Sequence, residues 1–88
     1  MQELIARTRQ LTDEQGNPLA FRYTLLESGT QEGDIDYGIG IDSSLGNQIR
    51  LPHLSIDRGA VEALLEQCAR LTLSPTHLPE VVQDWLGQ

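Results

Sequence analysis

The sequence contains no lysine, one cysteine and few aromatic residues, and each of these shortages excludes a class of protein. Thirteen acidic residues stand against six arginines, so the formal net charge is −7 at pH 7. An acidic chain repels the phosphates of nucleic acids and the anionic surface of membranes, so neither is expected as a partner. The lone Cys68 excludes an internal disulfide and a cysteine-based zinc cluster.

Long apolar runs are also missing. No stretch approaches the ~20 apolar residues of a membrane span, and the opening MQELIARTRQ lacks the apolar segment of a signal peptide. We therefore expect a cytoplasmic protein. The 88 residues are 39% hydrophobic and 22% charged, which is typical of a globular chain, and they predict a single domain spanning residues 1–88 with one modest core.

The first 54 residues show strand periodicity, in which apolar and polar side chains alternate. Turn-forming residues such as Gly16, Asn17 and Pro18 separate the alternating segments. The predicted strands are residues 3–13, 19–27, 34–42 and a short one at 48–52. Pro52 cannot donate a ladder hydrogen bond, so the last strand is expected to end there or to lie at an edge.

The last 34 residues show helical periodicity. After Ser55, a predicted N-cap, one apolar stripe contains Val61, Leu64, Leu65, Cys68 and Leu71. A second helix is predicted from about Thr76 to Gly87, with Pro79 in its first turn and a stripe of Leu78, Val81, Val82, Trp85 and Leu86. Strands followed by helices predict an α+β fold. We expect an antiparallel meander of three to four strands with both helices packed on one face.

Four segments resemble a known family. They are YGIGI (residues 37–41), LSID (54–57), VEALLEQCARL (61–71) and, most specifically, HLPEVVQDWL (77–86). Together they look like a small bacterial family of about this length, associated mainly with Firmicutes and classified only as a domain of unknown function. Gln83 stands where the family pattern has a glutamate. The resemblance supports the fold and implies no activity, cofactor or partner.

The second helix carries a histidine and two acids on one side. At ~100° per residue, His77, Glu80 and Asp84 fall within a sector of about 60°, beside the apolar stripe. Such a face suits a metal ion or a His–carboxylate pair, but it is also what an amphipathic helix presents to water. His-x-x-Glu without a second histidine is a weak metal signal. We interpret the face as solvated and free of metal.

The third predicted strand carries acids and glycines on one face. Asp34, Asp36 and Asp42 are expected to form charge pairs with arginines of neighbouring strands on the outer face of the sheet. The arginines are Arg7, Arg9 and Arg22. Gly38 and Gly40 lie on the same face, where a bulge or strong twist is favoured over the close approach of a second chain or a ligand.

The remaining candidate residues give no catalytic constellation. Cys68 is expected to be a buried, inert thiol, and His53 is not predicted to pair with it. No serine lies in a nucleophile elbow and no loop has the pattern of a phosphate cradle. The sequence therefore favours a non-enzymatic module that binds an unknown protein or itself, with no cofactor. Its possible partner surface comprises His77, Glu80, Asp84, Gly38 and Gly40. The alternative is a small-ligand or metal-binding protein using the His77, Glu80 and Asp84 face.

Overall fold

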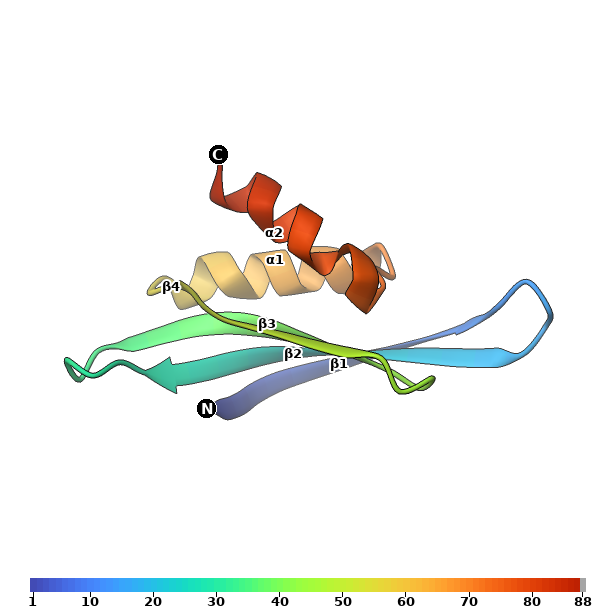
Figure 1. Ribbon diagram of the computed structural model, residues 1–88, viewed down its shortest axis with the longest axis horizontal. Helices are drawn as coiled ribbons and strands as arrows, with labels where there is room; N and C mark the ends of the chain where they lie inside the picture. Colours follow the sequence, from blue (N-terminus) through green and yellow to red (C-terminus); the bar gives the residue numbers. More distant parts are fainter. Residues whose placement is uncertain (88) are drawn as a thin grey trace.

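The computed structural model describes residues 1–87, which form a four-stranded sheet followed by two helices (Figure 1). The strands are β1 (Gln2–Thr12), β2 (Pro18–Gly29), β3 (Ile35–Ser43) and β4 (Gln48–Ser55). The helices are α1 (Arg58–Arg70), the 3-10 turn η1 (Pro75–His77) and α2 (Leu78–Leu86). All neighbouring strands are antiparallel, in the order β1-β2-β3-β4, and both helices lie on one face. The predicted meander is confirmed.

Tight turns explain why consecutive strands pair. Gly16 and Gly46 have φ values of 83° and 99°, which only glycine adopts at little cost. In the first turn the Asp13 carboxylate accepts the backbone N–H of Asn17 at 2.8 Å, while the Asp13 N–H donates to the Asn17 carbonyl at 2.9 Å. The chain therefore reverses within a few residues, and β2 lies beside β1.

The core lies between the sheet and α1. Four residues of the predicted α1 stripe are buried, namely Val61, Leu64, Leu65 and Cys68. On the sheet side, Tyr23 is fully buried, and its hydroxyl donates to the Leu73 carbonyl at 2.8 Å. This bond attaches the segment after α1 to the middle of the sheet. Burial raises the pKa of Tyr23 to about 12.

The helix stripes are shorter than their periodicity predicts. Leu71 and Leu86 were expected in the core, but they are 60% and 57% exposed. Leu71 is the C-cap of α1, and Thr72 follows with φ 49°, so the chain turns away before Leu71 reaches the sheet. Leu86 is the last residue of α2. Trp85, also expected in the core, is only partly buried.

The start of α1 also differs from the prediction. The N-cap is Asp57, whose carboxylate accepts the Ala60 N–H at 3.1 Å. Ser55, the predicted cap, is the last residue of β4, and its hydroxyl accepts the Asp57 N–H at 3.0 Å. Asp57 is the favoured N-cap because a carboxylate at this position accepts a free N–H of the first turn and interacts with the positive end of the helix dipole.

The last strand, β4, lies at an edge of the sheet, which confirms one of the two alternatives predicted from Pro52, and it continues beyond that proline. Leu51 is opposite Ile39 and Ser55 is opposite Tyr37, so three residues of β4 span what one residue, Gly38, spans on β3. The chain accommodates them by a bulge. A bulge tolerates a proline, because the residues within it do not need to donate to the ladder.

Candidate functional site

The three residues of the predicted partner face on α2 are exposed. His77 is at the N-cap position of α2 but makes no capping hydrogen bond through its side chain. Glu80 lies in the first turn, and Asp84 lies one turn later. Within residues 1–87, no group of three or more His, Cys, Asp and Glu side chains is arranged to hold a metal ion.

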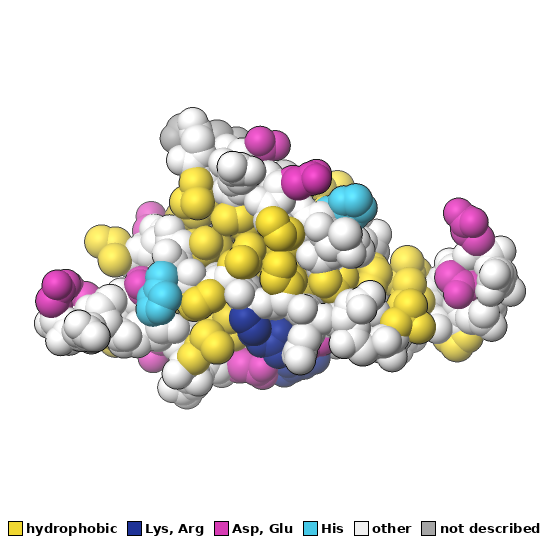
Figure 2. All heavy atoms as spheres, viewed as in Figure 1, with side chains coloured by type: hydrophobic (Ala, Val, Ile, Leu, Met, Phe, Trp, Pro, Cys, Tyr) yellow, Lys and Arg dark blue, Asp and Glu magenta, His cyan; other side chains and the backbone are white. Residues whose placement is uncertain are grey.

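Beside this face, hydrophobic side chains reach the surface between β4 and α2, which we call the β4–α2 band. Its members are the partly buried residues Ile49, Leu51, Leu54, Val81 and Trp85, which pack against the core from β4 and α2. Figure 2 shows hydrophobic side chains gathered on this side of the molecule, with acidic side chains and a histidine at the border. An apolar centre with a polar rim is the usual anatomy of a protein interface.

The outer face of the sheet carries a row of charged side chains, one from each strand. The Arg22 Nη2 of β2 is 2.9 Å from the Glu3 Oε2 of β1, and the Arg22 Nη1 is 3.9 Å from the Asp42 Oδ2 of β3. Asp42 also receives two hydrogen bonds from Arg50 of β4, at 2.7 and 3.1 Å. The hydrogen bond from Arg22 lowers the pKa of Glu3. These cross-strand pairs confirm the predicted charge pairing of Arg22 with Asp42 and keep this face polar.

The other two arginines were assigned to the wrong face. Arg7 is opposite Tyr23 and Arg9 is opposite Phe21, so both point toward the helices. The Arg7 Nε is 3.0 Å from the Glu66 Oε1 on α1. Periodicity could not assign this face, because a register shift between Glu3 and Ile5 changes which residues of β1 face the core. Asp34, expected in the outer row, precedes β3, where its backbone pairs with Thr30 in the turn.

Gly38 makes room for the backbone of β4. A Cβ on Gly38 would lie 2.2 Å from the Leu51 carbonyl oxygen and 2.5 Å from the Pro52 Cα. The bulge predicted for this position is present, and the chain that approaches the glycine closely is the protein's own β4. Leu26, directly opposite Gly38 on β2, is only 1% exposed although it lies on the outer face.

Gly40 has a different neighbour. Its Cβ would meet the Arg50 side chain, with the Cδ at 2.9 Å. Arg50 crosses this glycine on its way to Asp42. Both glycines are buried, and β4 occupies the space above each of them. The two positions were predicted as possible partner surface. They serve instead to let β4 lie close against the outer face.

A His–Asp pair at the bulge was missed by sequence reasoning. The His53 Nδ1 donates to the Asp36 carboxylate, at 2.7 and 2.8 Å from its two oxygens. Asp36 is 8% exposed, whereas about half of the His53 side chain is in solvent. His53 has a φ of 62°, an uncommon conformation for a residue with a side chain. The pair fastens the bulge to β3, and its only sequence signal was a histidine directly after a proline.

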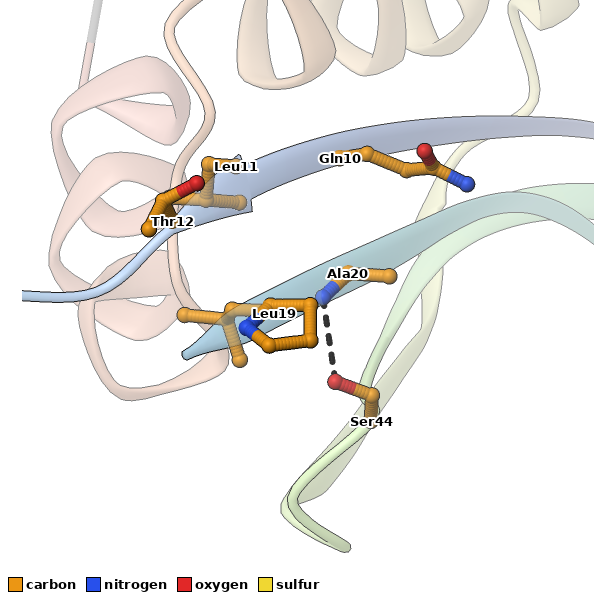
Figure 3. Close-up of a pocket in the computed structure, with 7 residues that line it drawn as sticks. Gln10, Leu11, Thr12, Leu19, Ala20 and Ser44 are labelled. Atoms are coloured by element: carbon orange, nitrogen blue, oxygen red, sulfur yellow. Dashed lines mark hydrogen bonds between the residues drawn. The ribbon is translucent and has the colours of Figure 1, made fainter. Parts of the chain in front are cut away.

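A shallow hollow lies elsewhere, beside the turn end of the β1–β2 hairpin (Figure 3). It measures about 510 Å³, and the residues around it include Gln10, Thr12, Ala20 and Ser44. The Ser44 hydroxyl accepts the Ala20 N–H at 3.0 Å. None of the lining residues is ionisable. The hollow therefore lacks the acid–base groups that a catalytic pocket requires.

Comparisons with known proteins give a family and leave the activity open. No helix in residues 1–87 has the length and apolar character needed to cross a membrane. No curated protein and no solved structure matches the chain at a significant level. A family model, described as a family of unknown function (DUF6514), matches residues 2–88. Because this match covers nearly the whole chain, the protein belongs to the DUF6514 family of unknown function.

Proposed function

We propose that the protein is a non-enzymatic binding module of the cytoplasm, and that it acts by contact with another protein through the β4–α2 band. The observation that carries this proposal is the partial exposure of Val81 and Trp85 beside apolar residues of β4. Aromatic and aliphatic side chains of this kind are the usual anchors of an interface. The rim is formed by His77, Glu80 and Asp84, the face that the sequence singled out.

The location of the charges favours a specific contact over non-specific adhesion. Glu80 and Asp84 add negative charge beside the band, on a chain that is already acidic overall. Like charges repel copies of the protein and acidic bystanders, whereas a partner with basic residues around an apolar centre is attracted. No observation favours the alternative, a metal site on the same face.

The experiment is co-purification from the native host with affinity-tagged protein. The single tryptophan is part of the band, so it also serves as a fluorescent probe of contact. We expect one partner to bind the wild type in a fixed ratio and to shift Trp85 emission to shorter wavelength. Two variants are expected to fold and to bind that partner weakly or not at all. One is Val81→Ser, and the other is the double variant Glu80→Gln with Asp84→Asn.

The matched control is Leu45→Ser, which removes a 72% exposed leucine from the β3–β4 turn, away from the band. It is expected to keep the partner. Circular dichroism of each variant separates loss of binding from loss of fold. Undiminished binding by folded Val81→Ser protein, together with an unchanged Trp85 spectrum, would refute the band as the interface.

A further inference from the structure

The opposite edge of the sheet, strand β1, carries a second feature that the β4–α2 band does not use. β1 is an end strand of the sheet, so the edge facing away from β2 has no strand beside it among residues 1–87. The other end strand, β4, is guarded by Pro52 and by its bulge. From Ile5 to Thr12, β1 pairs with β2 in regular register and contains no proline.

The hydrogen bonds of Ala20 show which backbone groups of β1 are open. The Ala20 carbonyl accepts the Ser44 N–H at 2.9 Å, and its N–H donates to the Ser44 hydroxyl at 3.0 Å. Ala20 therefore faces away from β1, and the backbone N–H and C=O of its partner Gln10 point out of the sheet. Because this direction alternates along a strand, the same holds for Ala6 and Thr8.

Positive charge gathers along this open edge. Arg7 and Arg9 lie on its helix side, and Arg70 lies on α1 one turn after Glu66, the residue that Arg7 contacts. Residues one turn apart share a helix face, so Arg70 also faces β1. Within residues 1–87, no carboxylate lies within salt-bridge distance of Arg9 or Arg70.

The remaining arginines are neutralised elsewhere. Arg22 and Arg50 pair with acids on the outer face, and Arg58 is 3.7 Å from Glu62 in its own helix. On a chain of net charge −7, the two arginines that have no carboxylate partner among residues 1–87, Arg9 and Arg70, therefore lie beside the long open edge of β1. A strand edge with open backbone groups and local positive charge suits a partner segment that is extended and negatively charged.

We propose that β1 binds an extended acidic segment of a partner protein by strand addition, with the partner's carboxylates on the helix side beside Arg9 and Arg70. The open N–H and C=O groups of Ala6, Thr8 and Gln10 supply the main-chain hydrogen bonds, and the arginines select the charge. A second copy of the chain fits poorly. Pairing two β1 strands along this edge places arginines of both copies side by side on one face.

This proposal stands apart from the proposed function, because it uses the other edge of the sheet and none of the residues of the β4–α2 band. The probe is a short fluorescein-labelled peptide in which valine and glutamate alternate, with both ends blocked. Its binding to the full chain is measured by fluorescence anisotropy at low salt. The control peptide has glutamine in place of every glutamate.

We expect saturable binding of the valine–glutamate peptide and weaker binding of the glutamine peptide. The Arg9→Gln and Arg70→Gln variants should each weaken the acidic peptide about 1.5- to 5-fold, the usual range for one exposed ion pair. Arg58→Gln removes the same charge from an arginine already paired with Glu62, and it should leave binding unchanged. Equal binding of the two peptides, or equal effects of the three variants, would overturn the charge selection.

Backbone pairing is tested separately. Along an added strand only alternate N–H groups face β1, so N-methylation of one alternate set of peptide residues should abolish binding while methylation of the other set should not. Loss with both sets, or with neither, rules out strand addition. The Thr8→Pro variant removes an outward N–H and should also lose the peptide. A dimer in sedimentation experiments that Thr8→Pro converts to monomer would overturn the proposal in favour of a second copy.

Discussion

Replacement of Gly38 by alanine is the sharpest test of the bulge on β4. The new Cβ would lie 2.2 Å from the Leu51 carbonyl oxygen, whereas a carbon–oxygen contact normally needs about 3.3 Å. The β4 backbone must therefore retreat by roughly 1 Å. Overpacking costs about 1 to 3 kcal/mol, and weakening the charged hydrogen bond between His53 and Asp36 costs about 1.5 to 3 kcal/mol. We expect Gly38→Ala to lose about 3 to 5 kcal/mol of unfolding free energy.

Gly40→Ala is the matched control, because only the flexible end of Arg50 stands in the way of its Cβ. That side chain can rotate, and alanine in a strand recovers about 0.5 to 1 kcal/mol relative to glycine, so we expect a net change below about 1 kcal/mol. Urea unfolding monitored by circular dichroism measures both variants. At about 4 to 8 °C per kcal/mol, the melting temperature of Gly38→Ala should fall by more than about 12 °C. Equal stabilities for the two variants would refute the reasoning.

Three further predictions concern individual side chains. Tyr23→Phe should lose about 1 kcal/mol, because the Leu73 carbonyl loses its donor. In the wild type, the pKa of Tyr23 rises from 10.0 in the unfolded chain to about 12 in the folded chain. Between these two pH values the unfolded state has already released the proton, so the free energy of unfolding should fall as the pH rises. The fall should be less steep in Tyr23→Phe, which lacks this hydroxyl. Burial raises the pKa of the Cys68 thiol, so a thiol reagent should label native protein slowly and denatured protein fast; rapid native labelling would contradict its burial. Glu80→Gln with Asp84→Asn should shift stability by less than about 0.5 kcal/mol per residue. Added zinc, manganese or calcium should not raise the melting temperature, and a rise that this double variant abolishes would establish the metal alternative.

The sequence predicted the fold well, because each element carried a clear periodic signal. The alternation of Ile35, Tyr37, Ile39 and Ile41 indicated β3, and the stripe around Cys68 indicated α1. Glycine-containing turns indicated that consecutive strands pair. The ends of the elements were predicted less well. Whether Ser55 or Asp57 caps α1 depends on backbone geometry, which the periodicity of the sequence does not contain.

The sites were predicted only in part. The exposed face of His77, Glu80 and Asp84 followed from helical spacing. The faces of Arg7 and Arg9 did not follow, because one register shift in β1 reverses the assignment of a whole segment. The partnership of His53 with Asp36 also stayed hidden, because its residues are 17 positions apart and meet only through the bulge. Such contacts depend on register, and register is a property of the assembled sheet.

The order of the elements along the chain has a consequence for folding during synthesis. Each strand pairs with its neighbour in sequence, so the whole ladder can form from residues 1–55 with short loop closures. The helices that cover the sheet are synthesised last, and Leu78 and Val82 of α2 are among the final buried residues to be made. Until then the sheet exposes apolar side chains that can associate with other chains. A fragment ending at Ser55 should therefore scatter light by aggregation at concentrations where the full chain stays clear, and a clear, monomeric fragment would show that the sheet does not need the helices as a cover.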